Sequence, residues 1–269
     1  MSDTDVLRVS RDGAIATVTL VASTMAPSFF TACERTFGEL GDDPELRAVI
    51  VRGSDRAFSY GLDLKEAFTK WGATMSGGGL ARARSELFAL VKQLQRSFTA
   101  VASCPVPVIA AIHGWCVGGG VDLISACDVR LASADAKFSI RETKVAMVAD
   151  LGSLQRLPRI ISPGHLRELA FTGKDIDAAR ALRIGLVNAV YPDRAALDAA
   201  ALALAGEVAA APPLVVRGVK HVLDQGDGKS VADGLDYVAA WNSAFLASED
   251  LGEATAAFAA RRPPAFKGR

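Results

Sequence analysis

VPVIAAIHGWCVGGGVDLISACDVRLASADAKFSIRETKVAMVAD, the stretch from Val106 to Asp150, decides the fold. It begins with an apolar, β-branched segment, Val106–Ile112, which has the composition of a buried strand. His113 and Gly114 end that strand, and Gly118–Gly120 then open a helical pattern that runs to Cys127. Glycines at a helix start leave bare N–H groups near the positive end of the helix dipole. This turn is therefore suited to stabilise negative charge, such as a phosphate or an enolate oxygen.

Three carboxylates follow the glycines in the same stretch. Asp122 comes directly after them, Glu142 lies twenty residues further on, and Asp150 eight beyond that. Glu142 and Asp150 lie in or beside apolar sequence, where ionisation is costly, so we expect their pKa values to rise toward the range of a working acid or base. The alternative is that these are solvated surface acids, with Asp122 bonded to backbone at the helix start. Spacing alone leaves both interpretations open.

Length and composition restrict the class of protein. The chain has 269 residues, half of them hydrophobic, and a formal net charge of zero, which gives no support for a nucleic-acid or membrane partner. Its polar, acidic start does not resemble a secretory signal, and no apolar run approaches membrane-spanning length. Cys33, Cys104, Cys116 and Cys127 fall at no metal-ligand spacing. We therefore expect reduced thiols, no metal site and a cytoplasmic protein.

The first hundred residues alternate between strand and helix patterns, which indicates an α/β fold with parallel crossovers. The glycine- and serine-rich segment Lys70–Gly79 is predicted to be a mobile loop. The strands and helices expected here are Leu7–Val9, Ala14–Leu20, Ser28–Leu40, Arg47–Arg52 and the long amphipathic helix Leu80–Ala102.

Beyond residue 200 the pattern becomes entirely helical, and we place a domain boundary there, separating residues 1–200 from residues 201–269. The expected elements after Asp150 are the helices Gly152–Ile161 and Ala178–Ile184, the strand Val187–Tyr191, and the helices Ala195–Ala210, Pro213–Gln225, Ser230–Leu246 and Leu251–Ala260. The apolar faces of the last helices exceed what one small layer needs, so we expect a neighbouring subunit to cover them.

Five segments in order resemble the crotonases, the enoyl-CoA hydratase/isomerase family, over nearly the whole chain. They are Phe58–Leu64 (FSYGLDL), Pro107–Gly114, Gly118–Gly120, Gln155–Pro158 and Phe258–Gly268. The resemblance implies an α/β crotonase-like spiral of ββα turns followed by a C-terminal helical oligomerisation region, assembled as a homotrimer or a dimer of trimers. It also implies an acyl-CoA thioester substrate and no separate cofactor, because coenzyme A is part of the substrate.

The acids indicate a branch of that family. Asp122 and Glu142 match the positions of the two hydratase glutamates, whereas Asp150 stands where hydratases typically have glycine. Val121–Asp128 and Ala149–Pro158 are similar to the Δ3,5-Δ2,4-dienoyl-CoA isomerases of fatty acid β-oxidation. This resemblance implies that Glu142 takes the C2 proton, that Asp150 in protonated form supplies one to C6, and that Asp122 supports both. We expect Val148, Ala149 and Leu151 to form an apolar wall around Asp150.

The resemblance also implies the binding groups. The N–H groups of Tyr60 and Gly119, with Gly120 as a neighbouring candidate, would form an oxyanion hole for the thioester oxygen. Ser59, Tyr60, Gly61, Leu62, Asp63 and Leu64 would bind coenzyme A, and the acyl chain would lie against the Leu80–Phe98 helix. A small residue is usual where Tyr60 stands, but only its backbone N–H is used. Ser23–Pro27 lacks the basic and Asn residues of many relatives, which leaves the contacts to the CoA phosphates open.

Two other functions remain open from the sequence. One is a 2-enoyl-CoA hydratase that uses Asp122 and Glu142 on water. The other is a non-catalytic CoA-binding or scaffold protein, which the intact acids argue against. RNA binding is disfavoured by zero net charge and by the lack of a basic stripe with aromatic residues. His113 is interpreted as a turn residue rather than a base.

Overall fold

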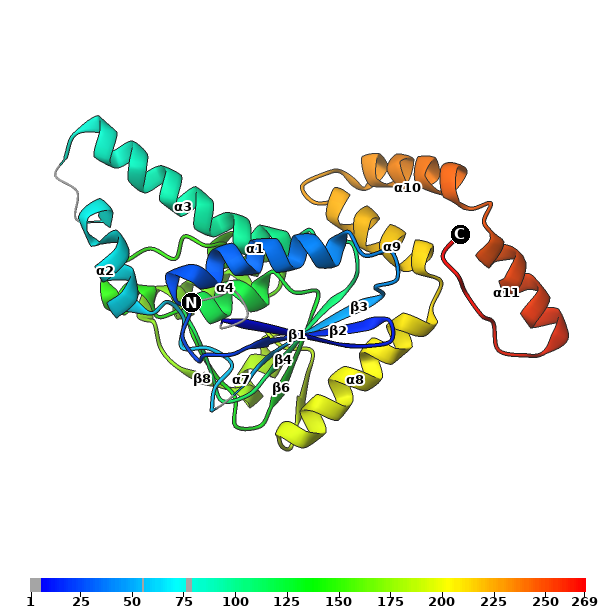
Figure 1. Cartoon of the computed structure of the whole chain (residues 1–269), viewed down its shortest axis with the longest axis horizontal. Coiled ribbons are helices and arrows are strands. Elements are labelled where there is room, and N and C mark those ends of the chain that lie inside the picture. The colour runs from blue at the N-terminus through cyan, green and yellow to red at the C-terminus, as the bar shows by residue number, and fades with distance from the viewer. Residues whose placement is uncertain (1–5, 55, 76–78) are drawn as a thin grey trace.

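The computed structural model describes residues 6–54, 56–75 and 79–269. Its main sheet has six strands in the order β1-β2-β3-β4-β6-β9, with β1 and β2 forming an antiparallel hairpin and every later pairing parallel. Figure 1 labels five of these strands, β1, β2, β3, β4 and β6. The strands are β1 (Leu7–Asp12), β2 (Ile15–Leu20), β3 (Ala48–Gly53), β4 (Val108–Ile112), β6 (Val129–Ser133) and β9 (Ala189–Tyr191). The central strands β3 and β4 are buried almost throughout, which is why their sequences are continuous apolar runs rather than alternating ones.

A second, three-stranded sheet joins β5 (Trp115–Val117), β7 (Lys137–Ser139) and β8 (Ile176–Asp177). The chain passes from β4 to β5 through Gly114, whose φ is +56°. A β-carbon at Gly114 would lie 2.3 Å from the carbonyl oxygen of Arg56, so the corner requires glycine. In β4-β5-α4 two strands in different sheets are followed by a helix, and β6-β7-η2 repeats this order, so the predicted ββα spiral is confirmed.

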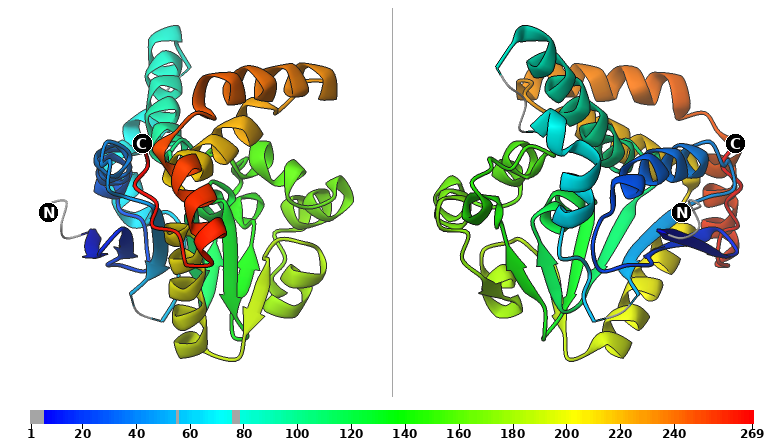
Figure 2. Two further views of the ribbon diagram at one scale, coloured as in Figure 1. Left: turned by 90° about the vertical axis from the view of Figure 1, so that its right-hand side faces the viewer. Right: turned by 60° about the vertical axis from the view of Figure 1, so that its left-hand side comes forward.

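Helices cover both faces of the main sheet. On one face α1 (Pro27–Gly41) packs against α3 (Ala81–Ala102), and Phe30 and Phe98 meet edge to face with ring centroids 6.0 Å apart. On the other face α8 (Arg194–Ala210) runs along the strands, as both views in Figure 2 show. Leu197, Ala201 and Ala205, spaced one turn apart, bury this side of α8 against β3, β4 and β6.

Residues 64–75 form a helix, α2 (Leu64–Met75), so the prediction of a loop over Lys70–Gly79 was wrong for Lys70–Met75. Residues 76–78 of that predicted loop lie outside the described residues. The Asp63 carboxylate accepts the Glu66 N–H at 3.0 Å at the start of the helix. Trp71 packs on Phe30 at a centroid distance of 6.3 Å, and this tertiary contact outweighs the low helix propensity of Gly72.

The remaining short elements connect the two sheets. They are α4 (Gly119–Ser125), η2 (Glu142–Val145), α5 (Ser153–Arg156), η3 (Leu157–Arg159), α6 (Pro163–Thr172) and α7 (Ala178–Arg183). The single helix expected over Gly152–Ile161 is thus two short pieces, because Pro158 lacks the N–H that a continuous helix would need. Asp177 caps α7, its carboxylate accepting the Arg180 N–H at 2.7 Å.

Three outer helices, α9 (Pro213–Gln225), α10 (Val231–Phe245) and α11 (Glu249–Ala260), lie beyond the end of α8 in Figure 1. The predicted boundary at residue 200 falls inside α8, so the change from core to outer helices comes after Ala210. Within the described part of the chain no single helix is long and apolar enough to cross a membrane; α8 and α9 pass that test only as a pair, bent by 106°.

All four cysteines are free and buried, which confirms the prediction of reduced thiols. Burial raises the pKa of each thiol; for Cys127 it reaches about 12. Cys33, Cys116 and Cys127 belong to the main hydrophobic core, where they pack as small apolar residues.

One ion pair ties the outer helices to the core. The Lys220 ammonium on α9 is buried and donates to the Asp128 carboxylate at 2.6 Å and to the Val106 carbonyl at 3.3 Å. The same Asp128 oxygen accepts the Val108 N–H at 2.7 Å, so the pair holds the start of β4 as well as α9.

Replacing Lys220 by Met should lower the free energy of unfolding by about 2–4 kcal/mol, because it leaves a partly buried carboxylate without its cation. Urea unfolding of the purified protein measures this. Adding Asp128→Asn to Lys220→Met should recover part of the loss. Equal stability of Lys220→Met and the wild type would contradict this role for the pair.

Candidate functional site

Among residues Ser59–Asp63, in the segment that follows β3, one backbone N–H has no partner in the described part of the chain. The other N–H groups from Ser59 to Asp63 all donate within the protein, to Trp115 O, Ser23 O, the Ser59 hydroxyl and Met25 O. Leu62 donates to no group in the described chain. Its parallel bridge to Met25 uses the flanking Gly61 carbonyl and Asp63 N–H, which turns the Leu62 N–H to the opposite side.

The Tyr60 N–H, predicted to be one donor of an oxyanion hole, donates instead to the Ser23 carbonyl at 2.6 Å. That prediction was wrong, because the N–H is already committed to the neighbouring segment. The Tyr60 side chain is 45 % exposed and therefore does not fill the interior of the site.

The glycine turn supplies the second unpaired donor. Gly118 has φ +52°, and its N–H donates to the Ser139 carbonyl at 3.0 Å. Gly119 and Gly120 begin α4, and neither N–H has a partner among the described residues, as expected for the first turn of a helix. Gly119 and Gly120 are thus placed as the sequence suggested.

The two segments touch through glycine. Gly61 has φ +83°, and a β-carbon on it would lie 2.7 Å from Val117 O and 3.0 Å from Gly119 N. A β-carbon on Gly119 would in turn lie 3.7 Å from the Leu62 nitrogen. The unpaired N–H groups of Leu62 and Gly119 are therefore neighbours.

Glu142 lies directly over this turn. It begins η2, and its Oε1 would be 3.2 Å from a β-carbon on Gly118. Its Oε2 is buried and has no hydrogen-bond partner in the described protein. Burial, helped by the nearby charge of Asp122, raises the pKa of Glu142 to about 7.

Asp122 is buried on α4, and its Oδ1 accepts the Ser153 N–H at 2.6 Å. Burial raises the pKa of Asp122 to about 6, although the bond from Ser153 opposes the shift; the charge of Asp150 adds to it. The Ser153 hydroxyl is also buried, and its interaction with the Asp122 carboxylate likewise opposes the rise in pKa.

Asp150 is the most open of the three acids. Its residue is exposed in the single chain, yet partial burial of the carboxyl raises its pKa. The predicted apolar wall is confirmed only in part: Ala149 and Leu151 are buried, but Val148 is 76 % exposed.

The three carboxyls form one electrostatically coupled group. The charges of Asp122 and Asp150 both raise the pKa of Glu142, and that of Asp150 raises the pKa of Asp122. Protons bound by such a group are shared among its members, so near neutral pH the group contains both protonated and ionised carboxyls. It is able to take a proton at one position and give one at another.

The residues predicted to bind coenzyme A lie at the edge of this site, but not all face outward. Ser59 is fully buried and its hydroxyl accepts the Gly61 N–H, so the side chain is occupied. Leu64 is 37 % exposed. Beside it lies an open hollow of about 570 Å³, which the sequence reasoning did not find, lined by Pro27, Ser28, Asp63, Lys65, Glu66, Thr69 and Lys70. Its charged groups are two lysines, Lys65 and Lys70, and two carboxylates, Asp63 and Glu66.

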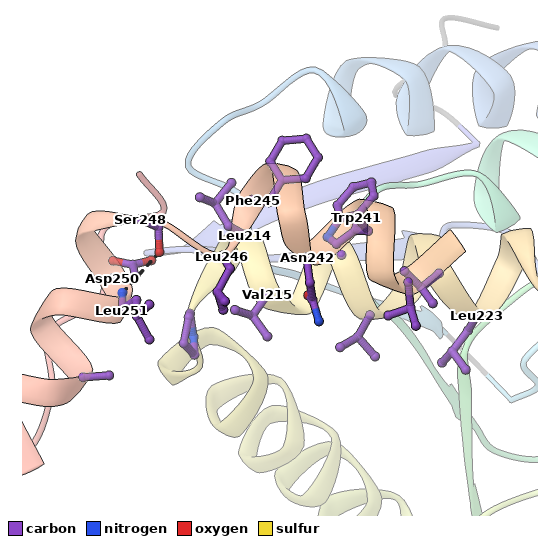
Figure 3. Close-up of a pocket in the computed structure, with 16 residues that line it drawn as sticks. Leu214, Val215, Leu223, Trp241, Asn242, Phe245, Leu246, Ser248, Asp250 and Leu251 are labelled. Carbon is purple, nitrogen blue, oxygen red and sulfur yellow. Dashed lines mark hydrogen bonds between the residues drawn. The ribbon is translucent and has the colours of Figure 1, made fainter. Parts of the chain in front are cut away.

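A separate hollow of about 310 Å³ lies among the outer helices (Figure 3), and Asp122, Glu142 and Asp150 are not among the residues that line it. Leu214, Val215 and Leu223 of α9 face Trp241 and Leu246, contributed by α10 and the residue after it. Val215, Leu223 and Leu246 are each more than half exposed in the single chain. The outer helices therefore leave these apolar side chains uncovered in the single chain.

Comparison with known proteins places this arrangement in a family. Residues 11–269 match the family model described as "Enoyl-CoA hydratase/isomerase". A mitochondrial Delta(3,5)-Delta(2,4)-dienoyl-CoA isomerase of Dictyostelium discoideum is 43% identical over 249 residues, covering 91% of this chain and 83% of the relative. A carnitinyl-CoA dehydratase of Salmonella arizonae is 34% identical over 272 residues, covering 97% and 98%. The crystal structure of an enoyl-CoA hydratase from Bacillus anthracis superposes with a TM-score of 0.88 at 28% identity, covering 98% of this chain and 100% of that one.

The raised pKa of Asp122 predicts how stability depends on pH. Its folded pKa, about 6, exceeds the ordinary value of 3.8, so its contribution to stability is fully present below pH 3.8 and is lost as the pH rises through 6. Asp122→Asn removes that loss and should be more stable than the wild type at pH 8. The free energy of unfolding of the variant minus that of the wild type should be about 2–3 kcal/mol larger at pH 8 than at pH 4. Urea unfolding at both pH values tests this. A difference that does not change with pH would refute it.

Proposed function

Because the chain belongs to the enoyl-CoA hydratase/isomerase family, the crotonases, we propose that it isomerises a 3,5-dienoyl-CoA to the 2,4-dienoyl-CoA. The observation that carries this proposal is the third carboxyl, Asp150, coupled to the Asp122–Glu142 pair beside two unpaired N–H groups. The 43% identity to an isomerase of that name supports the same choice. Coenzyme A enters as part of the substrate.

The first step is removal of a proton from C2. In this proposal the thioester oxygen accepts hydrogen bonds from the N–H groups of Leu62 and Gly119, with Gly120 as the neighbouring donor. The Glu142 carboxylate takes the proton as the C2–H bond breaks, and the electron pair moves onto the thioester oxygen. Donors fixed by the backbone stabilise this dienolate without having to reorient as the charge develops.

The second step adds a proton at C6. As the dienolate collapses, its electrons move along the conjugated chain, and a C6–H bond forms with the proton of the Asp150 carboxyl. The two double bonds thereby shift to the 2 and 4 positions. An apolar acyl chain lying over Asp150 would exclude water from this exposed carboxyl, which raises its pKa further and keeps it protonated until transfer.

Asp122 supports both acids without touching the reacting carbons. Glu142's own burial, together with the charge of Asp122, raises the pKa of Glu142 to about 7, which suits a base that works near neutral pH. The bond of Asp122 to the Ser153 N–H also fixes the end of the segment that carries Asp150.

A second candidate function is 2-enoyl-CoA hydration. Asp122 and Glu142 alone form an acid pair that could act on water, and the Bacillus anthracis structure with the same fold is an enoyl-CoA hydratase. A hydratase would have no use for the Asp150 proton, so the two functions make opposite predictions for that residue.

Asp150→Asn should lower the rate of 3,5-dienoyl-CoA isomerisation by on the order of 10²–10⁴-fold, as expected for one positioned acid. The ultraviolet band of the conjugated product follows this rate. The variant should still exchange the C2 proton in deuterated water, because Glu142 and both N–H donors remain. Unchanged isomerisation by the variant would eliminate the isomerase proposal. If wild type and variant hydrate a 2-enoyl-CoA equally well, the hydratase function would take its place.

We further propose that the protein works as a homotrimer or a dimer of trimers, with the apolar hollow of α9–α11 at a subunit contact. Sedimentation at micromolar concentration should then give three or six subunits. Val219→Glu combined with Leu223→Glu places two charges on exposed apolar positions and should shift the protein toward monomer. The matched change Val231→Glu, at an exposed position outside the lining of that hollow, should not. A wild-type monomer would contradict the proposal.

A further inference from the structure

The segment that carries Asp150, residues 150–152, forms no helix or strand, and contacts from other parts of the chain set its position. Its first carbonyl, that of Asp150, accepts the Gln95 side-chain amide at 2.7 Å. Its next carbonyl, that of Leu151, accepts the Arg156 guanidinium at 3.3 Å. At its far end, the Ser153 N–H donates to Asp122 at 2.6 Å. Of these contacts, only the one from Gln95 acts on the acid residue itself.

Lys92 supports the orientation of the Gln95 amide that the Asp150 carbonyl requires. The Lys92 ammonium donates to Gln95 Oε1 at 2.9 Å. An ammonium has no acceptor, so the amide oxygen must face Lys92, and the amide NH₂ is left to face the Asp150 carbonyl. The chain of bonds from Lys92 through Gln95 to Asp150 therefore has a single direction.

The base is fixed independently of this chain. Glu142 lies on η2, against the Gly118 turn, and no hydrogen bond between described residues joins it to α3. Loosening the contact from α3 would move the Asp150 carboxyl relative to C6 but leave the geometry at C2 unchanged. The two proton transfers thus depend on different supports.

We propose that Gln95, oriented by Lys92, is a positioning residue that holds Asp150 at the distance from C6 needed for the second proton transfer. This inference rests on the proposed isomerase function. Gln95 lies half-buried on α3 between the buried residues Leu94 and Phe98, whose packing fixes the helix from which the amide reaches. A rigid helix thereby sets the position of an acid in an irregular segment.

The test uses Gln95→Met, which keeps the length of the side chain and removes the N–H donor. With a 3,5-dienoyl-CoA in deuterated water, isomerisation should fall roughly 10- to 100-fold, since a misplacement of about 1 Å can cost on the order of 10²-fold. Exchange at C2, followed by mass spectrometry, should keep the wild-type rate. Lys92→Met, at an exposed position, should show the same selective loss to a smaller extent.

Gln93→Met is the matched control, because Gln93 is exposed on the same helix. It should leave both rates unchanged. Equal loss of isomerisation and C2 exchange in Gln95→Met would mean a merely structural role and would overturn the inference, as would no loss at all. If Gln95→Met does not fold, Lys92→Met decides by the same two rates. A wild type that exchanges C2 but forms no 2,4-dienoyl-CoA would reject the proposed function itself, whereas a wild-type isomerase with unaffected variants would reject only the role of Gln95.

Discussion

The site depends on a close approach of two backbone segments in which neither has room for a side chain. A β-carbon on Gly61 would lie 3.0 Å from the backbone nitrogen of Gly119, so the two segments can approach this closely only with glycine at position 61. The contact is possible because Gly61 adopts φ +83° and because β5 delivers the glycine turn from the second sheet. It brings the free N–H of one segment next to the free N–H of the other, and Glu142 closes over the same turn.

The acids oppose the stability of the fold. Asp122 and Glu142 bind protons more tightly when folded than when exposed, so their ionisation near neutral pH weakens the native state. The structure tolerates this because the cost is local and the support lies elsewhere: the paired phenylalanines between α1 and α3, the small residues of α8 against the sheet, and the buried Lys220–Asp128 pair. The acids that weaken the fold and the contacts that stabilise it therefore lie in different parts of the chain.

The sequence was informative wherever local pattern and chemistry coincide. Apolar surroundings were enough to predict the raised pKa values of Glu142 and Asp150, and continuous β-branched runs were enough to predict β3 and β4. It failed where a partner distant in sequence decides the outcome. Whether the Tyr60 or the Leu62 N–H is free depends on Ser23 and Met25, and α2 is helical partly because Trp71 finds Phe30. The predicted boundary at residue 200 falls inside α8 because the whole region reads as helix from sequence, whereas the packing of the small residues of α8 on the sheet depends on strands distant in sequence.

The burial of all four thiols has a practical consequence for studying motion in this protein. Alkylating probes react with the thiolate, and here every native thiol is both inaccessible and held in its protonated form. A cysteine introduced at an exposed position would thus be modified selectively without first removing the native ones. Spin labels or fluorophores on α2 and α10 would then report, in otherwise unaltered protein, whether the two ends of the molecule move together when a thioester is bound.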